Sequence, residues 1–203
     1  SQVCANPAQS VECPISRHTA HERRDAMFHV HFIWAQSTSG IIGVNGKLPW
    51  HDRGDLQHFK DLTTGHVVVM GRKTRQSLPQ RNKRLPNRTN IVLSRTMKST
   101  RAIKAVASPY AAIEQTLNEG RDEMWVIGGH ETFQAFITAH DLDKIPFRLD
   151  AYVSVLNVDD EIQPITTDDT LTWAPVLDDR WVMLYDHMAG PRRRLQKYVK
   201  VFR

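Results

Sequence analysis

The sequence predicts an α/β fold, in which one domain is built on a mostly parallel central sheet of about eight strands with helices on both faces. Short apolar segments alternate with amphipathic, helix-like segments along the chain. This alternation is typical of parallel strands joined by helical connections. Near the C-terminus, two strand-like segments instead flank Ala189-Gly190-Pro191, which predicts a hairpin and an antiparallel C-terminal edge strand.

The chain divides into an expected tail and an expected domain. Residues 1–26 are polar and aperiodic, which predicts a flexible N-terminal tail, and residues 27–203 carry the ordered pattern. Asp52 is an N-cap candidate for one helix, and Ser108 followed by Pro109 opens another. The expected strands are residues 28–35, 67–70, 90–93, 103–106, 124–127, 152–156, 181–187 and 196–202. The expected helices are residues 53–62, a short helix ending at 78, 109–118 and 130–139, and residues 41–50, 79–88 and 157–179 are expected loops.

Composition limits the partners and the compartment. The formal net charge of +5 and the pI of about 9.4 favour anionic partners, either nucleic acid or small phosphorylated and carboxylated ligands, but an ordinary solvated basic surface is the preferred explanation. Both cysteines, Cys4 and Cys13, lie in the expected tail, so the core needs no disulfide and fits a reducing cytoplasm. No apolar run approaches the roughly 20 residues of a membrane span. We expect a cytoplasmic protein without a secretory signal.

A single carboxylate follows an aromatic loop. The run Gly46-Lys47-Leu48-Pro49-Trp50 precedes Asp55, which lies at the start of an expected helix. Apolar residues at helical spacing follow it, and they place the carboxylate at the edge of an apolar cleft. Such a carboxylate can accept two hydrogen bonds from the amidine-like edge of a flat heterocycle. The alternative is a first-turn acid that only interacts favourably with the helix dipole.

Three polar turns follow expected strands and therefore share the carboxyl edge of the sheet, where ligands of such folds bind. They are Gly71-Arg72-Lys73-Thr74, Ser94-Arg95 and Gly128-Gly129. Glycines let a backbone approach a phosphate, and the N–H groups of a helix start can hold it, although each turn could equally be an ordinary capped helix start or strand end. The cations favour NADPH over NADH. Together the turns and the carboxylate indicate a dinucleotide-dependent reductase.

Two other interpretations remain open from the residues alone. His51, Asp55 and His58 could hold a metal on one helix face, but a helix that begins at Asp52 or Arg53 would exclude His51, and we predict no metal site. The run Arg192-Arg193-Arg194 could bind nucleic acid, or it could be the charged limb of a solvated edge strand.

These motifs together resemble the dihydrofolate reductase family, and especially its actinobacterial members. The resemblance extends from about Phe28 to the C-terminus. It is carried by the opening strand Phe32-Ile33-Trp34-Ala35, the loop of residues 42–50, Asp55, Met70-Gly71-Arg72-Lys73-Thr74, residues 85–90, Leu93-Ser94-Arg95 and Val126-Ile127-Gly128-Gly129. It implies a dihydrofolate-reductase-like fold, reduction of 7,8-dihydrofolate to 5,6,7,8-tetrahydrofolate with NADPH, and a cis Gly128–Gly129 bond. A monomer that binds antifolates such as trimethoprim or methotrexate, and neither membrane nor nucleic acid, is expected.

The resemblance also implies roles for individual residues. The catalytic group would comprise Asp55, Trp50 and Ser154. The substrate would be bound by Ile33, Trp34, Ala35, Asp55, Phe59, Leu78, Leu85, Arg88 and Ile127, with Arg88 pairing with its glutamate carboxylate. The cofactor would be bound by Ala35, Ile42, Gly43, Lys47, Leu48, Gly71, Arg72, Lys73, Thr74, Leu93, Ser94, Arg95, Ile127, Gly128, Gly129, His130, Glu131, Thr132 and Phe133.

Some positions depart from the family pattern. A third glycine is replaced by His130, an aromatic hydroxyl by Phe133, and the glycine before Arg88 by Asn87, which tolerates left-handed geometry. A tryptophan after the Gly-Arg-x-Thr run is replaced by Arg75, and a proline before the acid by Arg53. A pyrimidine reductase of riboflavin synthesis, a basic nucleic-acid-binding module and a metal hydrolase are the alternative functions.

Overall fold

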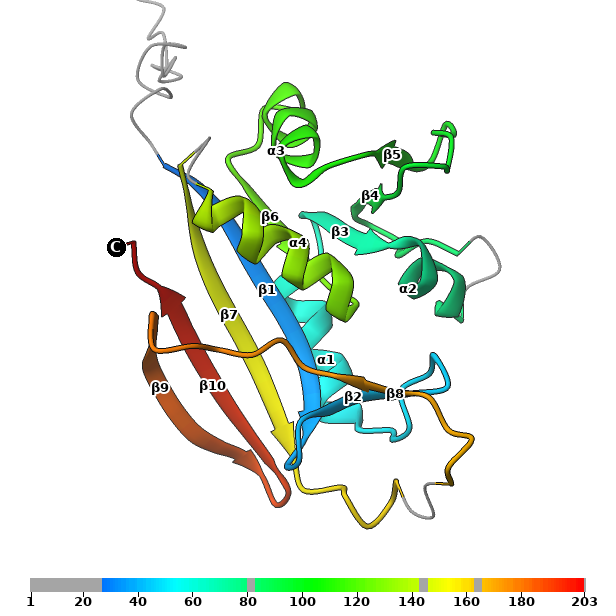
Figure 1. The fold of residues 1–203 in the computed structure, drawn as a ribbon, viewed down its shortest axis with the longest axis vertical. Helices are drawn as coiled ribbons and strands as arrows, with labels where there is room; N and C mark the ends of the chain where they lie inside the picture. Colours follow the sequence, from blue (N-terminus) through cyan, green and yellow to red (C-terminus); the bar gives the residue numbers. More distant parts are fainter. Residues whose placement is uncertain (1–26, 80–82, 143–145, 163–165, 203) are drawn as a thin grey trace, which may run out of the picture.

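An eight-stranded sheet forms the centre of the protein. The computed structural model describes residues 27–79, 83–142, 146–162 and 166–202, so the expected tail lies outside the described residues. The strand order is β5-β4-β3-β6-β1-β7-β10-β9, with parallel pairing from β5 to β7 and antiparallel pairing of β7 with β10 and of β10 with β9 (Figure 1). The predicted α/β fold with antiparallel strands at its C-terminal edge is therefore confirmed.

The elements follow the predicted order along the chain. The strands are β1 (Phe28–Ser37), β2 (Ile41–Val44), β3 (Val67–Gly71), β4 (Thr89–Leu93), β5 (Lys104–Val106), β6 (Glu123–Val126), β7 (Phe147–Leu156), β8 (Leu171–Trp173), β9 (Trp181–Gly190) and β10 (Arg193–Lys200). The helices are α1 (Arg53–Thr63), α2 (Arg72–Ser77), α3 (Pro109–Asn118) and α4 (His130–Asp141). Among the described helices, none is long and apolar enough to cross a membrane.

The predicted start of β7 was wrong. The strand begins at Phe147 rather than at Tyr152, because Arg148 and Asp150 interrupt the apolar pattern that marks a buried strand. Asp150 is 2% exposed, and it forms ion pairs with His31 and Arg148. These partners offset the cost of burying the carboxylate. His31 belongs to the neighbouring strand β1, so its contact comes from tertiary pairing, whereas Arg148 lies only two residues away in β7.

The expectation of loops at residues 41–50 and 157–179 was also wrong in part. Each contains a short strand, because β2 and β8 pair antiparallel with one another across a long stretch of chain. Asn45 and Gly46 form a tight turn after β2 with φ of 52° and 73°, which is typical of an Asn-Gly hairpin turn. The Asn45 side chain donates to Asp169 at 2.7 Å and accepts from the Thr170 N–H at 2.9 Å, which fixes the β2–β8 ribbon.

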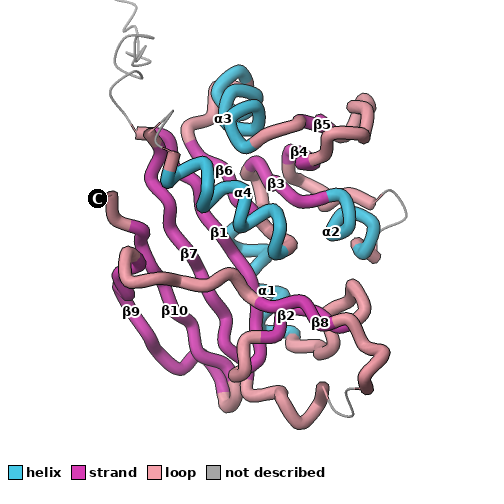
Figure 2. The backbone as a smooth tube through the Cα atoms, viewed as in Figure 1, coloured by secondary structure: helices cyan, strands magenta, loops and turns pink. Residues whose placement is uncertain are grey.

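The two faces of the sheet carry separate apolar clusters. Helices α3 and α4 cover one face, where Phe133 and Phe136 pack against Phe32 at ring distances of 4.9 and 6.4 Å. Helix α1 covers the other face, where Phe59 and Leu62 contact a second cluster of strand residues. Figures 1 and 2 show α4 in front of β1 and α1 behind it. Helices therefore lie on both faces, as the sequence predicts.

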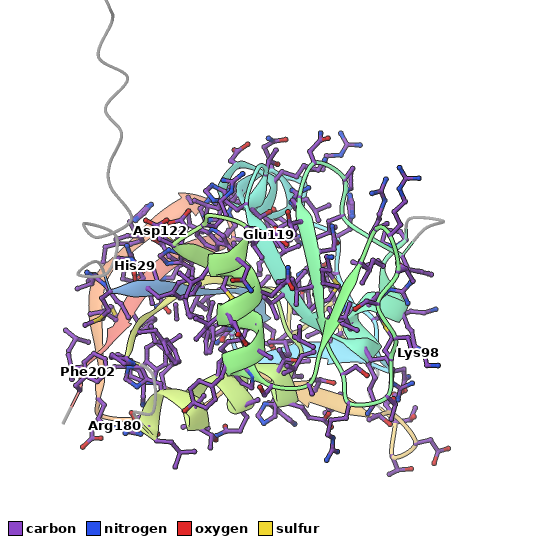
Figure 3. All side chains as sticks on the ribbon, turned by 90° about the horizontal axis from the view of Figure 1, so that it is seen from above. His29, Lys98, Glu119, Asp122, Arg180 and Phe202 are labelled. Carbon is purple, nitrogen blue, oxygen red and sulfur yellow. The ribbon has the colours of Figure 1, made fainter. Side chains whose placement is uncertain are left out.

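A charged network joins the end of α4 to the antiparallel edge. The fully buried Lys200 ammonium lies 3.5 Å from Asp141 and 3.6 Å from Asp178. Arg180 donates to both oxygens of Asp141 at 2.8 Å, and Figure 3 shows Arg180 near Phe202 at this corner of the molecule. Burial alone would raise the pKa of Asp141, but the Arg180 hydrogen bonds and the Lys200 charge outweigh it and hold that pKa below its ordinary value.

This network predicts a pH-dependent contribution to stability. Asp141→Asn should lower the free energy of unfolding by about 1–3 kcal/mol at neutral pH, because it weakens two charge-assisted contacts and leaves a buried cation with one fewer partner. Since the pKa of Asp141 is depressed in the folded protein, this difference should disappear as the pH falls below about 4. Urea unfolding of the wild type and of Asp141→Asn at several pH values measures this difference in the free energy of unfolding.

Asp186→Asn is the matched control, because Asp186 pairs with the exposed Arg194 at 2.8 Å on the surface. The free energy of unfolding of this control variant should fall by less than about 1 kcal/mol. Equal losses for the two variants would contradict the importance of the Lys200 network.

Candidate active site

Asp55 lies in the first turn of α1, directly after a capped start. The helix begins at Arg53, and the Asp52 side chain accepts from the Asp55 N–H at 2.8 Å, so the predicted N-cap is confirmed. His51 therefore lies outside the helix and does not share a face with Asp55 and His58. Within the described ranges, no group of three or more His, Cys, Asp or Glu side chains is placed to hold a metal ion.

The Asp55 side chain is 9% exposed, and its surroundings shift its protonation. Burial raises the pKa of the Asp55 carboxyl above its ordinary value, because water no longer stabilises the charge. A hydrogen bond from Ser154 and the positive charge of Arg193 offset part of this rise, whereas the charge of Asp52 adds to it. The structure thus brings together Asp55 of α1 and Ser154 of β7, which the sequence places far apart.

An apolar cluster lies on the face of the sheet that α1, the helix of Asp55, covers. One cluster on the α1 face of the sheet contains the buried Ile33 and Leu85, with Phe59, Leu78 and Ile127 packed against it. All five belong to the set that the family resemblance assigns to the substrate. These five side chains therefore form one apolar surface on the face of the sheet that α1, the helix of Asp55, covers. An arrangement of this kind suits a flat ring with a polar edge.

Arg88 is held in a fixed orientation next to this surface. Its Nε donates to Thr63 Oγ1 at 2.9 Å, its Nη1 donates to the Pro86 carbonyl at 2.7 Å, and its guanidinium lies 5.6 Å from the centre of the Phe59 ring. Asn87 has a φ of 56°, so the predicted left-handed geometry before Arg88 is confirmed. The guanidinium remains half-buried, with donors available for an anion.

The glycine turns at the ends of β3 and β6 are bonded to each other. The Gly71 N–H donates to the Gly128 carbonyl at 2.8 Å, and a Cβ at Gly71 would come within 2.6 Å of Thr132 Oγ1. Gly128 has a φ of 108°, which favours glycine, and the Gly128–Gly129 bond is cis as the resemblance implies. Backbone from two strands and the start of α4 therefore meet without side chains between them.

Positive charges surround these glycine turns. Arg72 and Lys73 open α2, and Arg95 follows β4; all three are exposed. At the start of α4 the His130 ring nitrogen Nδ1 lies 3.0 Å from the Trp173 carbonyl, so the residue that replaces a glycine is tied to β8. This edge of the sheet can accept a phosphate-rich ligand.

The remaining predicted site residues lie in other environments. Trp34 and Phe133 are buried in the cluster on the α4 face, with their rings 5.3 Å apart, and Ile42 packs against the same cluster. Trp50 is buried with Ala35 packed nearby in a third cluster. Gly43 lies in β2, Leu93 ends β4 with Ser94 after it, and Thr74 lies in α2. Lys47 and Leu48 are exposed in the loop after β2, as is Glu131 in the first turn of α4. The individual roles of these residues stay predictions.

The basic run 192–194 is neutralised within the chain. Arg192 pairs with Glu161 and lies 3.7 Å from Asp52, Arg193 lies 3.3 Å from Asp52, and Arg194 pairs with Asp186. The guanidinium groups are therefore engaged by carboxylates of the same molecule. This arrangement argues against the alternative of a nucleic-acid-binding surface at this strand.

Sequence reasoning missed three residues that shape the site. Asn90 is 3% exposed and bonds the backbone of Leu85 in both directions at 2.8 Å, and Thr63 accepts from Arg88. Arg193 packs over the first turn of α1. Buried polar residues such as Asn90 could have been noticed at a strand start, but the partners of Arg193 are visible only in three dimensions.

Comparisons with known proteins agree with this arrangement. A model of the dihydrofolate reductase family matches residues 29–152. The chain is 39% identical over 175 residues to the dihydrofolate reductase of Mycobacterium leprae, covering 83% of this chain and 96% of that protein. It is 36% identical over 155 residues to the dihydrofolate reductase of Mycobacterium tuberculosis, covering 76% and 85%. A match to the Bacillus subtilis enzyme of the same name has 36% identity over 51% of this chain and 60% of the relative. The chain therefore belongs to the dihydrofolate reductase family.

Proposed function

We propose that this protein catalyses the NADPH-dependent reduction of 7,8-dihydrofolate to 5,6,7,8-tetrahydrofolate. The observation that carries this proposal is the buried Asp55 carboxylate, with Ser154 as its partner, on the helix that packs against the apolar surface of the α1 face. Membership of the dihydrofolate reductase family supports the same reaction. The reaction needs two flat rings held face to face with water excluded, and a supply of one proton.

Asp55 would bind the amidine-like edge of the pterin through both oxygens. Its raised pKa brings proton exchange closer to neutral pH, where a general acid or base is most effective. Trp50 is 6% exposed, and its indole N–H has no hydrogen-bond partner in the part of the chain that the structure describes. We propose that this donor orients a water that carries the proton, because a carboxylate bound at one ring edge does not reach the distant N5.

The remainder of the substrate would lie along the apolar surface. Phe59 and Leu85 would clamp the pterin and the aminobenzoyl ring, and Arg88 would bind the glutamate carboxylate. Thr63 and Pro86 already fix one side of the guanidinium, so little rotational freedom would be lost on binding. Antifolates such as methotrexate or trimethoprim present similar ring edges and are expected to compete for this surface.

The carboxyl edge fits NADPH. The close contact of Gly71 with Gly128 and Thr132 leaves bare backbone at the start of α4, where N–H groups can bind a pyrophosphate. Arg72, Lys73 and Arg95 provide exposed cations for a 2′-phosphate. When bound, NADPH would supply the hydride that the pterin accepts. The contribution of the chain would be to hold both ligands, exclude bulk water and supply the proton through Asp55 and the water oriented by Trp50.

The decisive assay follows absorbance at 340 nm with NADPH and dihydrofolate. We expect a steady loss of absorbance that requires both compounds and is abolished by methotrexate. Absence of turnover by folded protein, or turnover insensitive to methotrexate, would reject the proposed reaction.

Asp55→Asn should separate activity from stability. Turnover near neutral pH should fall roughly 100-fold or more, because the amide cannot exchange a proton. The variant should also be more stable by about 0.5–2 kcal/mol at neutral pH. Because the pKa of Asp55 is raised on folding, its charge opposes folding above the ordinary pKa of about 4, so the gain should vanish below that pH. Steady-state kinetics and urea unfolding test both parts, and unchanged turnover would refute the role of Asp55.

Arg88→Leu should mainly affect binding of the substrate tail. Loss of a charge-assisted contact should raise KM for dihydrofolate about 10- to 100-fold with a smaller change in kcat. Arg84→Leu is the matched control, because Arg84 is an exposed arginine of the same loop. An Arg88 variant with the same KM as the control would reject the assignment.

Cofactor preference should depend on the exposed cations. Arg72→Ala combined with Arg95→Ala should raise KM for NADPH at least about tenfold and leave KM for NADH nearly unchanged, since only NADPH carries the 2′-phosphate. Arg121→Ala, in the connection that leads into β6 at the opposite edge, serves as the control. Equal increases in KM for NADH and for NADPH would show that these arginines do not bind the 2′-phosphate.

A further inference from the structure

The side chain of Arg193 reaches from β10 to the start of α1. In the pairing of β7 with β10, Ser154 lies opposite Leu195, and Arg193 lies two residues before Leu195 in β10. Alternate residues of a strand point to the same face, so Arg193 extends on the same face of the sheet as Ser154. The strand also carries a register shift relative to β9 between Arg193 and Arg194, a feature that often redirects side chains.

Arg193 contacts the turn that precedes Asp55 at several points. Its Nη1 lies 3.3 Å from Asp52 Oδ1, the same oxygen that caps the Asp55 N–H, and its Nη2 donates to the Ala189 carbonyl at 3.1 Å. A Cβ at Gly54 would come within 3.0 Å of the guanidinium carbon, so the absent side chain of Gly54 makes room for the arginine. The Arg193 side chain is only 13% exposed.

We infer that Arg193 is a positioning residue for Asp55: its guanidinium fixes the Asp52–Asp55 turn from the neighbouring strand and places a permanent positive charge beside the carboxylate. This inference rests on the proposed function, because it gives Arg193 a role in the proposed action of Asp55. The inference also gives Arg193, which belongs to the basic run 192–194, a role other than nucleic-acid binding. Arg192 also approaches the Asp52–Asp55 turn, and its Nε lies 3.7 Å from Asp52 Oδ2.

The charged and titratable groups around Asp55 determine the sign of the effect. Asp52 is the N-cap of α1, His58 lies on α1, Ser154 on β7 and Arg193 on β10, and His187 on β9 acts on His58. Arg193 favours the ionised form of Asp55, whereas Asp52 disfavours it. Removing the arginine charge should therefore raise the pKa of Asp55, and the pH dependence of turnover should move with it.

The first experiment measures kcat/KM for dihydrofolate against pH. In Arg193→Met, which keeps a long stem without charge, the limb of the profile that reports Asp55 should shift to higher pH. Arg193→Lys, which keeps the charge, should restore the wild-type position. Arg194→Met is the matched control, because the neighbouring arginine pairs with Asp186 on the exposed surface, and its profile should coincide with that of the wild type. A purely structural role would lower the melting temperature of Arg193→Met without moving the profile.

The second experiment tests the contact with Gly54. Alanine is a better helix former than glycine, but its Cβ would occupy the place of the guanidinium. Gly54→Ala should raise KM for dihydrofolate roughly threefold or more in the wild-type background and have little effect in Arg193→Met, because coupled residues give non-additive effects.

The outcomes separate this inference from the proposed function. An unshifted profile in Arg193→Met, a shift that Arg193→Lys does not restore, an equal shift in Arg194→Met, or additive effects with Gly54→Ala would each overturn the inference. If these occur while Asp55→Asn is inactive, only the role of Arg193 fails. If Asp55→Asn is fully active, the proposed function of Asp55 fails first.

Discussion

The burial of the Asp55 carboxylate is the constraint on which the rest of the site depends. A charge removed from water must be held by hydrogen bonds and neighbouring charges, or it becomes protonated. Here it is 9% exposed, and strands that lie far from it in the sequence provide its partners, Ser154 from β7 and Arg193 from β10. The antiparallel edge therefore contributes directly to the site, because β10 pairs with β7 and brings the arginine to the start of α1.

The strand order explains why the two proposed ligand surfaces meet. β1 lies between β6 and β7, so the turn after β6 and the residue Ser154 of β7 lie on either side of the same central strand. The bonded pair Gly71 and Gly128 adds the end of β3 to this edge. The glycine backbone at the ends of β3 and β6 and Ser154, the partner of Asp55, therefore share one end of the sheet, as the proposed transfer between two bound molecules requires.

Much of this arrangement could be predicted from the sequence where the signals are local. The capped start of α1 at Asp52 and the opening of α3 at Pro109 match their predictions, because capping depends on residues within one turn. The family resemblance assigned a set of apolar residues to the substrate, and the structure brings five of them into one cluster, although their roles stay predictions. The family resemblance supplied what local patterns do not, including the cis bond at Gly128.

The parts that escaped prediction depend on long-range pairing. The short β2–β8 ribbon forms between segments that each look like loops, and its stability comes partly from the side chain of Asn45. The start of β7 was missed because Arg148 and Asp150 break its apolar pattern, and the buried Asp150 is tolerated partly through His31 of β1, which is distant in sequence. Arg193 looked like part of a solvated basic limb, because neither Asp52 nor Gly54 is near it in the chain.

The most direct test of the central claim is an NMR titration of the Asp55 carboxyl carbon, assigned by comparison with Asp55→Asn. The account predicts a midpoint above that of an ordinary aspartate, and a signal that changes when a pterin ligand binds. A carboxyl group that titrates at or below the ordinary value, and that does not respond to the ligand, would contradict the claim that a buried Asp55 receives the substrate.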